Sequence, residues 1–177
     1  MKRSRRSGFT LVEILIVVVI MGILASIVIP QFAQSSDDAR YSSTTQNLQT
    51  LRSQIDLYRN QHENRYPGNT SGAANDTDFA EQMTFPTNAA GARATPPEKG
   101  FGDTNFSFGP YVTNRLPANP FNGSRVVKTV TNGNFGTAPT TPPAATDPGW
   151  VYDVTSGRIK INKDGKTPDG QQNYWDL

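Results

Sequence analysis

A single long apolar run dominates the N-terminal part of the chain. From Phe9 to Ile29 nearly every residue is hydrophobic, and Glu13 is the only charged side chain in that stretch. A bilayer's hydrocarbon core is about 30 Å thick and a helix rises about 1.5 Å per residue, so about 20 apolar residues cross it. Lipid favours a helix because a helix satisfies its own backbone hydrogen bonds. We therefore expect a transmembrane helix over residues 9–30.

Beyond Pro30 the chain turns polar but keeps a helical pattern to about Asn64. Apolar side chains then recur three and four positions apart, which marks one face of a helix: Leu48, Leu51, Ile55 and Tyr58. We expect an amphipathic helix over residues 31–65 that continues the apolar helix and packs against the chain's own folded domain. Pro30 removes one backbone hydrogen bond and should kink the helix at the junction.

Residues 66–177 have the pattern of a small folded domain. Residues 68–99 are rich in Gly, Ala, Asn, Thr and Pro, and predict an extended surface loop with one or two helical turns at 78–83. Strand-like segments follow at residues 125–131, 149–154 and 158–162, and the last two are joined by a hairpin turn. The pattern predicts an α+β fold, with the long helix packed on a small antiparallel sheet.

A short basic leader, residues 1–8, precedes the apolar run and carries Lys2, Arg3, Arg5 and Arg6. Positive charge beside a membrane helix favours the cytoplasmic side, so the remainder of the chain should lie across the membrane. A cleaved secretory signal is the alternative, but the apolar run is longer than a usual signal core and no A-x-A site follows it.

Composition narrows the functional classes. The chain has 17 Lys and Arg, of which four lie in the leader, so 13 basic residues remain against 15 acidic ones. Without the leader the net charge is −2, which gives no support for nucleic-acid binding. The chain has no cysteine. No catalytic motif is present, and His62, the only histidine, is interpreted as a solvated residue near a helix end, so we expect no enzyme.

Glu13 is the unusual residue of the apolar run. A carboxylate inside such a segment costs on the order of 2–4 kcal/mol, so its presence needs a reason. One reason is its place near the cytoplasmic end, beside the positive N-terminus of the helix. Another arises if the chain is cut between Gly8 and Phe9, because the new α-amino group of one subunit could then pair with Glu13 of its neighbour.

The run Gly8-Phe9-Thr10-Leu11-Val12-Glu13, behind a basic leader and ahead of an apolar helix, resembles the class III signal of type IV pilins and type II secretion pseudopilins. The resemblance implies that a prepilin peptidase cleaves between Gly8 and Phe9 and methylates Phe9. It also implies a pilin-like fold, and assembly roles for Glu13 and for the helix-kinking Pro30.

A second run resembles the G-type major pseudopilins. Gly109-Pro110-Tyr111 and Leu116-Pro117-Ala118-Asn119-Pro120-Phe121 match the family pattern GPY…LP-x-[DN]-P-[WF]. The lack of cysteine agrees with this group, because many type IV pilins close a C-terminal loop with a disulfide.

Calcium is the one cofactor for which the resemblance suggests ligands. G-type pseudopilins bind calcium in a C-terminal loop, and in this chain the matching loop is shortened and offers Asp164 and Asp169. Asp-Gly pairs are also ordinary turns, and the loop contains two lysines. Asp164 and Asp169 are therefore interpreted either as calcium ligands or as residues of ordinary turns.

We therefore expect a major pseudopilin-like subunit of a type II secretion system, which polymerises into a periplasmic filament that drives protein export. The expected location is the inner membrane, with one span and the C-terminal domain in the periplasm. The resemblance implies as partners further copies of the chain, the peptidase, an inner-membrane assembly platform and minor pseudopilins. The alternatives are a type IV pilin for adhesion, motility or DNA uptake, and an anchored binding module that never polymerises.

Overall fold

A computed structural model describes residues 8–70, 72–94 and 105–177 of the chain. The basic leader residues at positions 2–6 and the end of the predicted surface loop lie outside these ranges. The chain divides into an N-terminal unit, Met1–Ala39, and a C-terminal unit, Arg40–Leu177.

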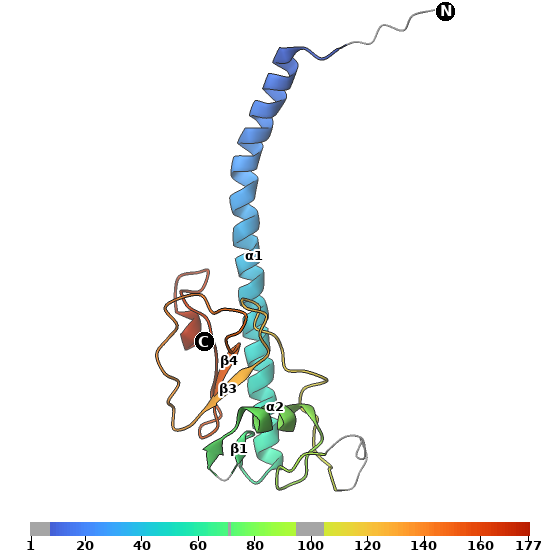
Figure 1. The fold of residues 1–177 in the computed structure, drawn as a ribbon, viewed down its shortest axis with the longest axis vertical. Coiled ribbons are helices and arrows are strands. Elements are labelled where there is room, and N and C mark those ends of the chain that lie inside the picture. Colours follow the sequence, from blue (N-terminus) through green and yellow to red (C-terminus); the bar gives the residue numbers. More distant parts are fainter. Residues whose placement is uncertain (1–7, 71, 95–104) are drawn as a thin grey trace, which may run out of the picture. The chain divides into compact units, whose positions relative to one another are not determined.

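One long helix, α1 (Leu11–Gln61), carries both the apolar run and the amphipathic stretch, and Figure 1 draws it as an uninterrupted ribbon. Pro30 lies inside this helix. The kink expected at this residue stays a prediction. The helix ends three residues before the expected Asn64, because Glu63 and Asn64 take positive φ angles of 54° and 62°. The backbone N–H of Asn64 then donates to the carbonyl of Arg59 at 3.0 Å, which closes the last turn.

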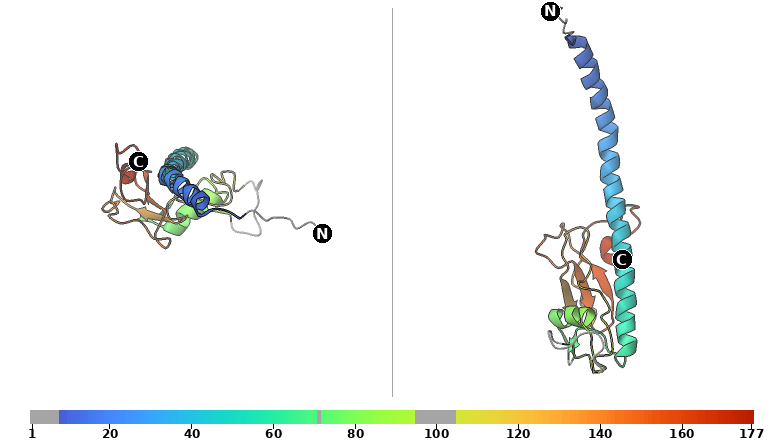
Figure 2. Two further views of the ribbon diagram at one scale, coloured as in Figure 1. Left: turned by 90° about the horizontal axis from the view of Figure 1, so that it is seen from above. Right: turned by 90° about the vertical axis from the view of Figure 1, so that its right-hand side faces the viewer.

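The C-terminal unit is built on the apolar stripe of α1. Leu48, Leu51, Ile55 and Tyr58 are each at most 2% exposed and belong to the main hydrophobic cluster. The prediction that this stripe packs against the chain's own domain is confirmed. The sheet lies alongside this part of α1, as the right-hand view of Figure 2 shows.

The sheet has three strands, β3 (Val127–Val130), β4 (Trp150–Asp153) and β5 (Ile159–Ile161), in the order β3-β4-β5. The strand positions and the β4–β5 hairpin were predicted correctly. The all-antiparallel sheet was not, because β3 and β4 are parallel, with Val127 opposite Trp150. Parallel neighbours need a long crossover, and the Gly- and Pro-rich residues 131–149 supply it by returning the chain to the end of the sheet where β3 began.

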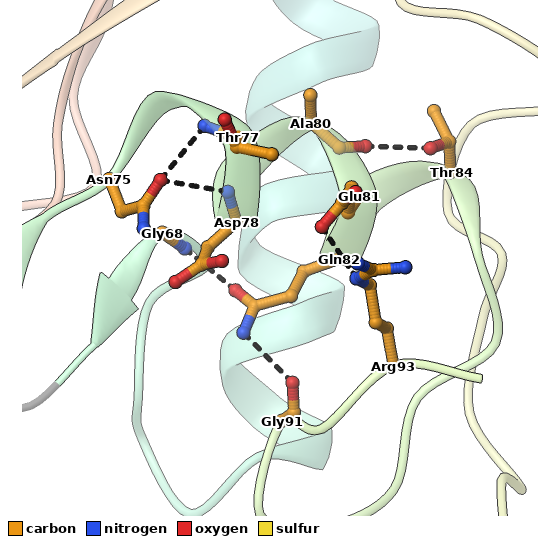
Figure 3. Close-up of polar contacts among 10 residues, drawn as sticks. All are labelled: Gly68, Asn75, Thr77, Asp78, Ala80, Glu81, Gln82, Thr84, Gly91 and Arg93. Carbon is orange, nitrogen blue, oxygen red and sulfur yellow. Dashed lines mark hydrogen bonds and ion pairs between the residues drawn. The ribbon is translucent and has the colours of Figure 1, made fainter. Parts of the chain in front are cut away.

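Residues 68–70 and 72–94 are more ordered than the predicted surface loop. They form a small antiparallel pair, β1 (Asn69–Thr70) and β2 (Ala73–Ala74), and the helix α2 (Asp76–Thr84). The side chain of Asn75 caps α2 by accepting the N–H groups of Thr77 and Asp78 at 3.0 and 3.2 Å (Figure 3). Two apolar residues on α2, Phe79 and Met83, are fully buried, which fixes the helix on the core.

Polar contacts attach the neighbouring chain segments to α2. The amide of Gln82 accepts the N–H of Gly68 at 2.7 Å and donates to the carbonyl of Gly91 at 2.8 Å (Figure 3). The carboxylate of Asp76 accepts the N–H of Thr129 on β3 at 2.6 Å. Residues 68–70 and 72–94 are therefore part of the folded unit.

The proline- and aromatic-rich run at residues 109–121 connects the sheet with α1. The indole of Trp150 on β4 donates to the carbonyl of Pro117 at 2.9 Å, and the hydroxyl of Tyr111 donates to Gln61 on α1 at 2.6 Å. Asn119 is fully buried and donates to the carbonyls of Gly149 and Asn162 at 2.9 and 3.1 Å. A buried amide needs such partners, which gives this run a structural reason for its Asn119.

His62 is fully buried, so its interpretation as a solvated residue was wrong. Its ring stacks on Tyr58 with centroids 3.8 Å apart. One ring nitrogen lies 2.8 Å from the carbonyl of Tyr58, and the other lies 2.9 Å from the hydroxyl of Thr87. The helical pattern alone places His62 at the end of a helix. The chain folds back after α1, so the segment that contains Thr87 covers His62.

Burial lowers the pKa of His62 below its ordinary value of 6.5. As the pH falls, His62 binds a proton in the unfolded chain before it does so in the folded chain. The stabilisation that neutral His62 contributes is therefore complete above about pH 6.5 and is lost as the pH falls below that value. We expect the free energy of unfolding of the full-length chain in detergent, followed by tryptophan fluorescence, to fall below about pH 6.5 with a slope of at most about 1.4 kcal/mol per pH unit.

The variant His62→Gln removes the titrating group and should flatten the pH dependence of the free energy of unfolding below about pH 6.5. An unchanged slope in this variant would show that other groups cause it.

Candidate processing and assembly site

The predicted cleavage site lies just outside the start of α1. Gly8, Phe9 and Thr10 precede the helix, which begins at Leu11. Phe9 is 84% exposed, and a Cβ atom built on Gly8 would meet no heavy atom of the described chain within 4 Å. A peptide bond in an exposed, non-helical end is the kind that a peptidase can reach, so the backbone between Gly8 and Phe9 is accessible.

A capping box sets the start of the helix. The carboxylate of Glu13 accepts the backbone N–H and the hydroxyl of Thr10, both at 2.7 Å. In return the backbone N–H of Glu13 donates to the hydroxyl oxygen of Thr10 at 3.2 Å. This reciprocal arrangement satisfies N–H groups that a helix start would otherwise leave without partners.

The sequence pattern contained this feature, although Thr10 was not identified as a functional residue. A threonine followed three residues later by a glutamate, ahead of an apolar run, is the usual signature of the capping box. Glu13 therefore has a role within its own helix, in addition to any role between subunits. Both of its side-chain bonds use one carboxylate oxygen, Oε2.

The N-terminal part of α1 is apolar on every side. Its large hydrophobic side chains, from Leu11 to Ile29, are between 41% and 81% exposed. This helix has the length and composition to cross a membrane, and none of its most apolar window is buried within the chain. Ser26, a polar residue here, donates its hydroxyl to the carbonyl of Ile23 at 2.7 Å, which satisfies the group inside the helix. Such a surface requires lipid or other apolar helices around it.

The structure does not gather Asp164 and Asp169 into a metal site. Within the described ranges, no group of three or more His, Cys, Asp or Glu side chains could hold a metal ion. Asp164 is paired with the ammonium group of Lys163, and Asp169 accepts bonds from Thr167 and Gln171. Calcium takes six to eight oxygen ligands, so these residues do not fit the calcium site that the resemblance implies.

A cavity of about 390 Å³ lies between the end of α1 and α2, lined in part by His62, Gln82 and Arg93. Its polar side chains bond to protein groups. Gln82 joins two backbone segments, and Arg93 forms an ion pair with Glu81 at 2.5 Å (Figure 3). The polar side chains of Gln82 and Arg93 in the cavity wall are therefore explained by their contacts within the fold.

Comparison with known proteins points to one family. The family model described as "Prokaryotic N-terminal methylation motif" matches residues 3–29. The chain is 32% identical over 120 residues to type II secretion system core protein G of Vibrio cholerae, a match that covers 68% of each chain. It is 32% identical over 117 residues to the protein of that name from Dickeya chrysanthemi, covering 66% of this chain and 64% of the relative.

The protein of the same name from Aeromonas hydrophila is 38% identical over 72 residues, covering 41% of this chain and 50% of the relative. For the first relatives the match spans about half of their length or less. No solved structure matches the chain.

The capping box predicts how substitutions affect the helix start. Thr10→Ala removes the two bonds that the Thr10 hydroxyl makes with Glu13 and should destabilise the first turn by about 1 kcal/mol. Amide hydrogen exchange at residues 11–14, measured on the full-length chain in detergent, should then be about fivefold faster.

Glu13→Gln is the matched control, because glutamine also completes a capping box. Exchange at those amides should stay close to the wild-type rate. Equal acceleration by both substitutions would contradict the assignment of the box.

Proposed function

Because this chain belongs to the family of type II secretion system core protein G, we propose that it is a major pseudopilin-like subunit, which polymerises into a periplasmic filament that drives protein export. The observation that carries the proposal is the order of features at the N-terminus. An accessible Gly8–Phe9 bond is followed by Glu13 and by a helix that is apolar on all sides. A plain membrane anchor needs only the last of these.

In this proposal a prepilin peptidase hydrolyses the peptide bond between Gly8 and Phe9. The basic leader leaves with the carboxyl group of Gly8, and Phe9 receives a free α-amino group, which is then methylated. The non-helical conformation of residues 8–10 supports this step, because the scissile bond is free of helical hydrogen bonds.

Assembly would follow from the chemistry of the new terminus. The amine of Phe9 in one subunit can pair with Glu13 of a neighbour, whose Oε1 takes no part in the capping box bonds. Pairing lowers the cost of placing both charges in an apolar surrounding. The exposed apolar helices then pack against one another, and a heterologous contact that does not close produces a helical filament. Pro30 would mark the point at which this packed segment ends.

The proposed location follows from the same segment. Residues 1–8 stay in the cytoplasm before cleavage, residues 9–30 span the inner membrane, and residues 66–177 form the periplasmic domain, joined by the amphipathic stretch 31–65. The proposed partners are further copies of the chain, the prepilin peptidase, an assembly platform in the inner membrane and minor pseudopilins.

The charge of Glu13 provides the test. In cells with a complete type II secretion machine, Glu13→Ala and Glu13→Gln should each reduce cross-linked multimers at least about tenfold, because the neighbouring amine loses its counter-charge. Glu13→Gln separates the two roles of the residue, since it keeps the capping box but not the charge.

Glu63→Gln is the control, because it removes an exposed carboxylate in the turn after α1 and should leave assembly unchanged. Normal multimers from both Glu13 variants would sink the proposed pairing and favour a subunit that serves only as an anchor.

A further inference from the structure

The C-terminal loop, residues 162–173, connects β5 with the short helix η1 (Tyr174–Asp176). It is the segment in which the family resemblance implies a calcium ion. A bound divalent cation would stabilise a loop by drawing several oxygen atoms together. In this chain the ammonium group of Lys163, a residue of the loop, contacts oxygen atoms of the loop instead.

Lys163 places its ammonium group on the oxygen atoms of the following residue. Nζ donates to the backbone carbonyl of Asp164 at 2.7 Å and also to its carboxylate. Each of the two side chains is only 18% exposed. Two of the Asp164 oxygen atoms that could ligate a metal, the backbone carbonyl and Oδ1, are therefore already bound to a cation.

Two aromatic rings complete the surroundings of this ammonium group. Nζ of Lys163 lies 5.2 Å from the ring centre of Phe121 and 5.4 Å from that of Tyr174. The two rings contact each other edge to face, with centroids 4.9 Å apart. Cations are attracted to ring faces, most strongly where water is excluded. The ammonium group thus joins the loop to Phe121, which is distant in sequence, and to Tyr174 of η1.

These contacts hold the end of the chain on the core. Tyr174 is 4% exposed and packs edge to face against Tyr41 of α1, with centroids 6.1 Å apart. Its backbone N–H donates to the carbonyl of Gly165 at 3.1 Å. Lys163 therefore contacts η1 through Tyr174, which in turn packs against α1.

Asp169, the second candidate calcium ligand, is used within its own turn. Its carboxylate accepts the hydroxyl of Thr167 and the backbone N–H of Gln171, the latter at 3.1 Å. Thr167 is 3% exposed, and its backbone N–H donates to the carbonyl of Gln172 at 2.9 Å. The turn is closed by hydrogen bonds among protein groups.

We infer that the ammonium group of Lys163 acts as the internal cation of the C-terminal loop, so that the C-terminal unit folds without calcium. A divalent ion at Asp164 would meet a fixed positive charge beside it and would have to displace that charge from the carboxylate. The inference holds whether or not the subunit assembles into a filament, so its failure and that of the proposed function can be told apart.

The test is a thermal melt of the full-length chain in detergent, followed by the fluorescence of Trp150 and Trp175. Neither excess EDTA nor millimolar calcium chloride should shift the wild-type melting temperature. Lys163→Met keeps the length of the side chain and removes the cation, and should lower the melting temperature by about 3–8 °C.

Lys166→Met is the matched control, because Lys166 lies exposed in the same loop, and this variant should melt like the wild type. Stabilisation of the wild-type chain by calcium would overturn the inference, and so would a Lys163→Met variant as stable as the wild type. The calcium titration decides the question even if Lys163→Met fails to fold.

Discussion

A helix surface that is apolar on every side cannot remain in water, and the rest of this structure depends on that constraint. The segment from Leu11 to Ile29 contributes no buried residue to the chain's own core. Its hydrophobic surface must therefore be covered by lipid or by equivalent helices of other copies. The C-terminal unit, by contrast, buries its own stripe of α1 from Leu48 to Tyr58 against the sheet. One helix thus carries a segment that needs external partners and a segment that has internal ones.

The start of the helix links this constraint with the proposed processing. Thr10 and Glu13 set the start of the helix by a reciprocal pair of bonds, so Phe9 and Gly8 lie outside it. A single carboxylate therefore helps to place the accessible peptide bond and also supplies the charge that a neighbour's amine would meet. This explains why an acidic residue is useful in a segment that otherwise avoids charge.

Local periodicity was enough to predict α1, its buried stripe and the β4–β5 hairpin, because these depend on residues close in sequence. The pairing of β3 with β4 depends on the path of residues 131–149, which the alternation pattern does not record. His62 was misjudged for the same reason, since its hydrogen-bond partner Thr87 comes from a distant segment. For the site, Gly8, Phe9 and Glu13 came from a recognisable motif, whereas the contact of Lys163 with Phe121 and Tyr174 is a tertiary feature.

The central claim, that this chain is processed as a pseudopilin, is tested most directly by the intact mass of the protein extracted from membranes of cells with a prepilin peptidase. The account predicts loss of residues 1–8 and one added methyl group on Phe9. A chain that keeps its full N-terminus in those cells would contradict it, and the apolar helix would then be a plain anchor.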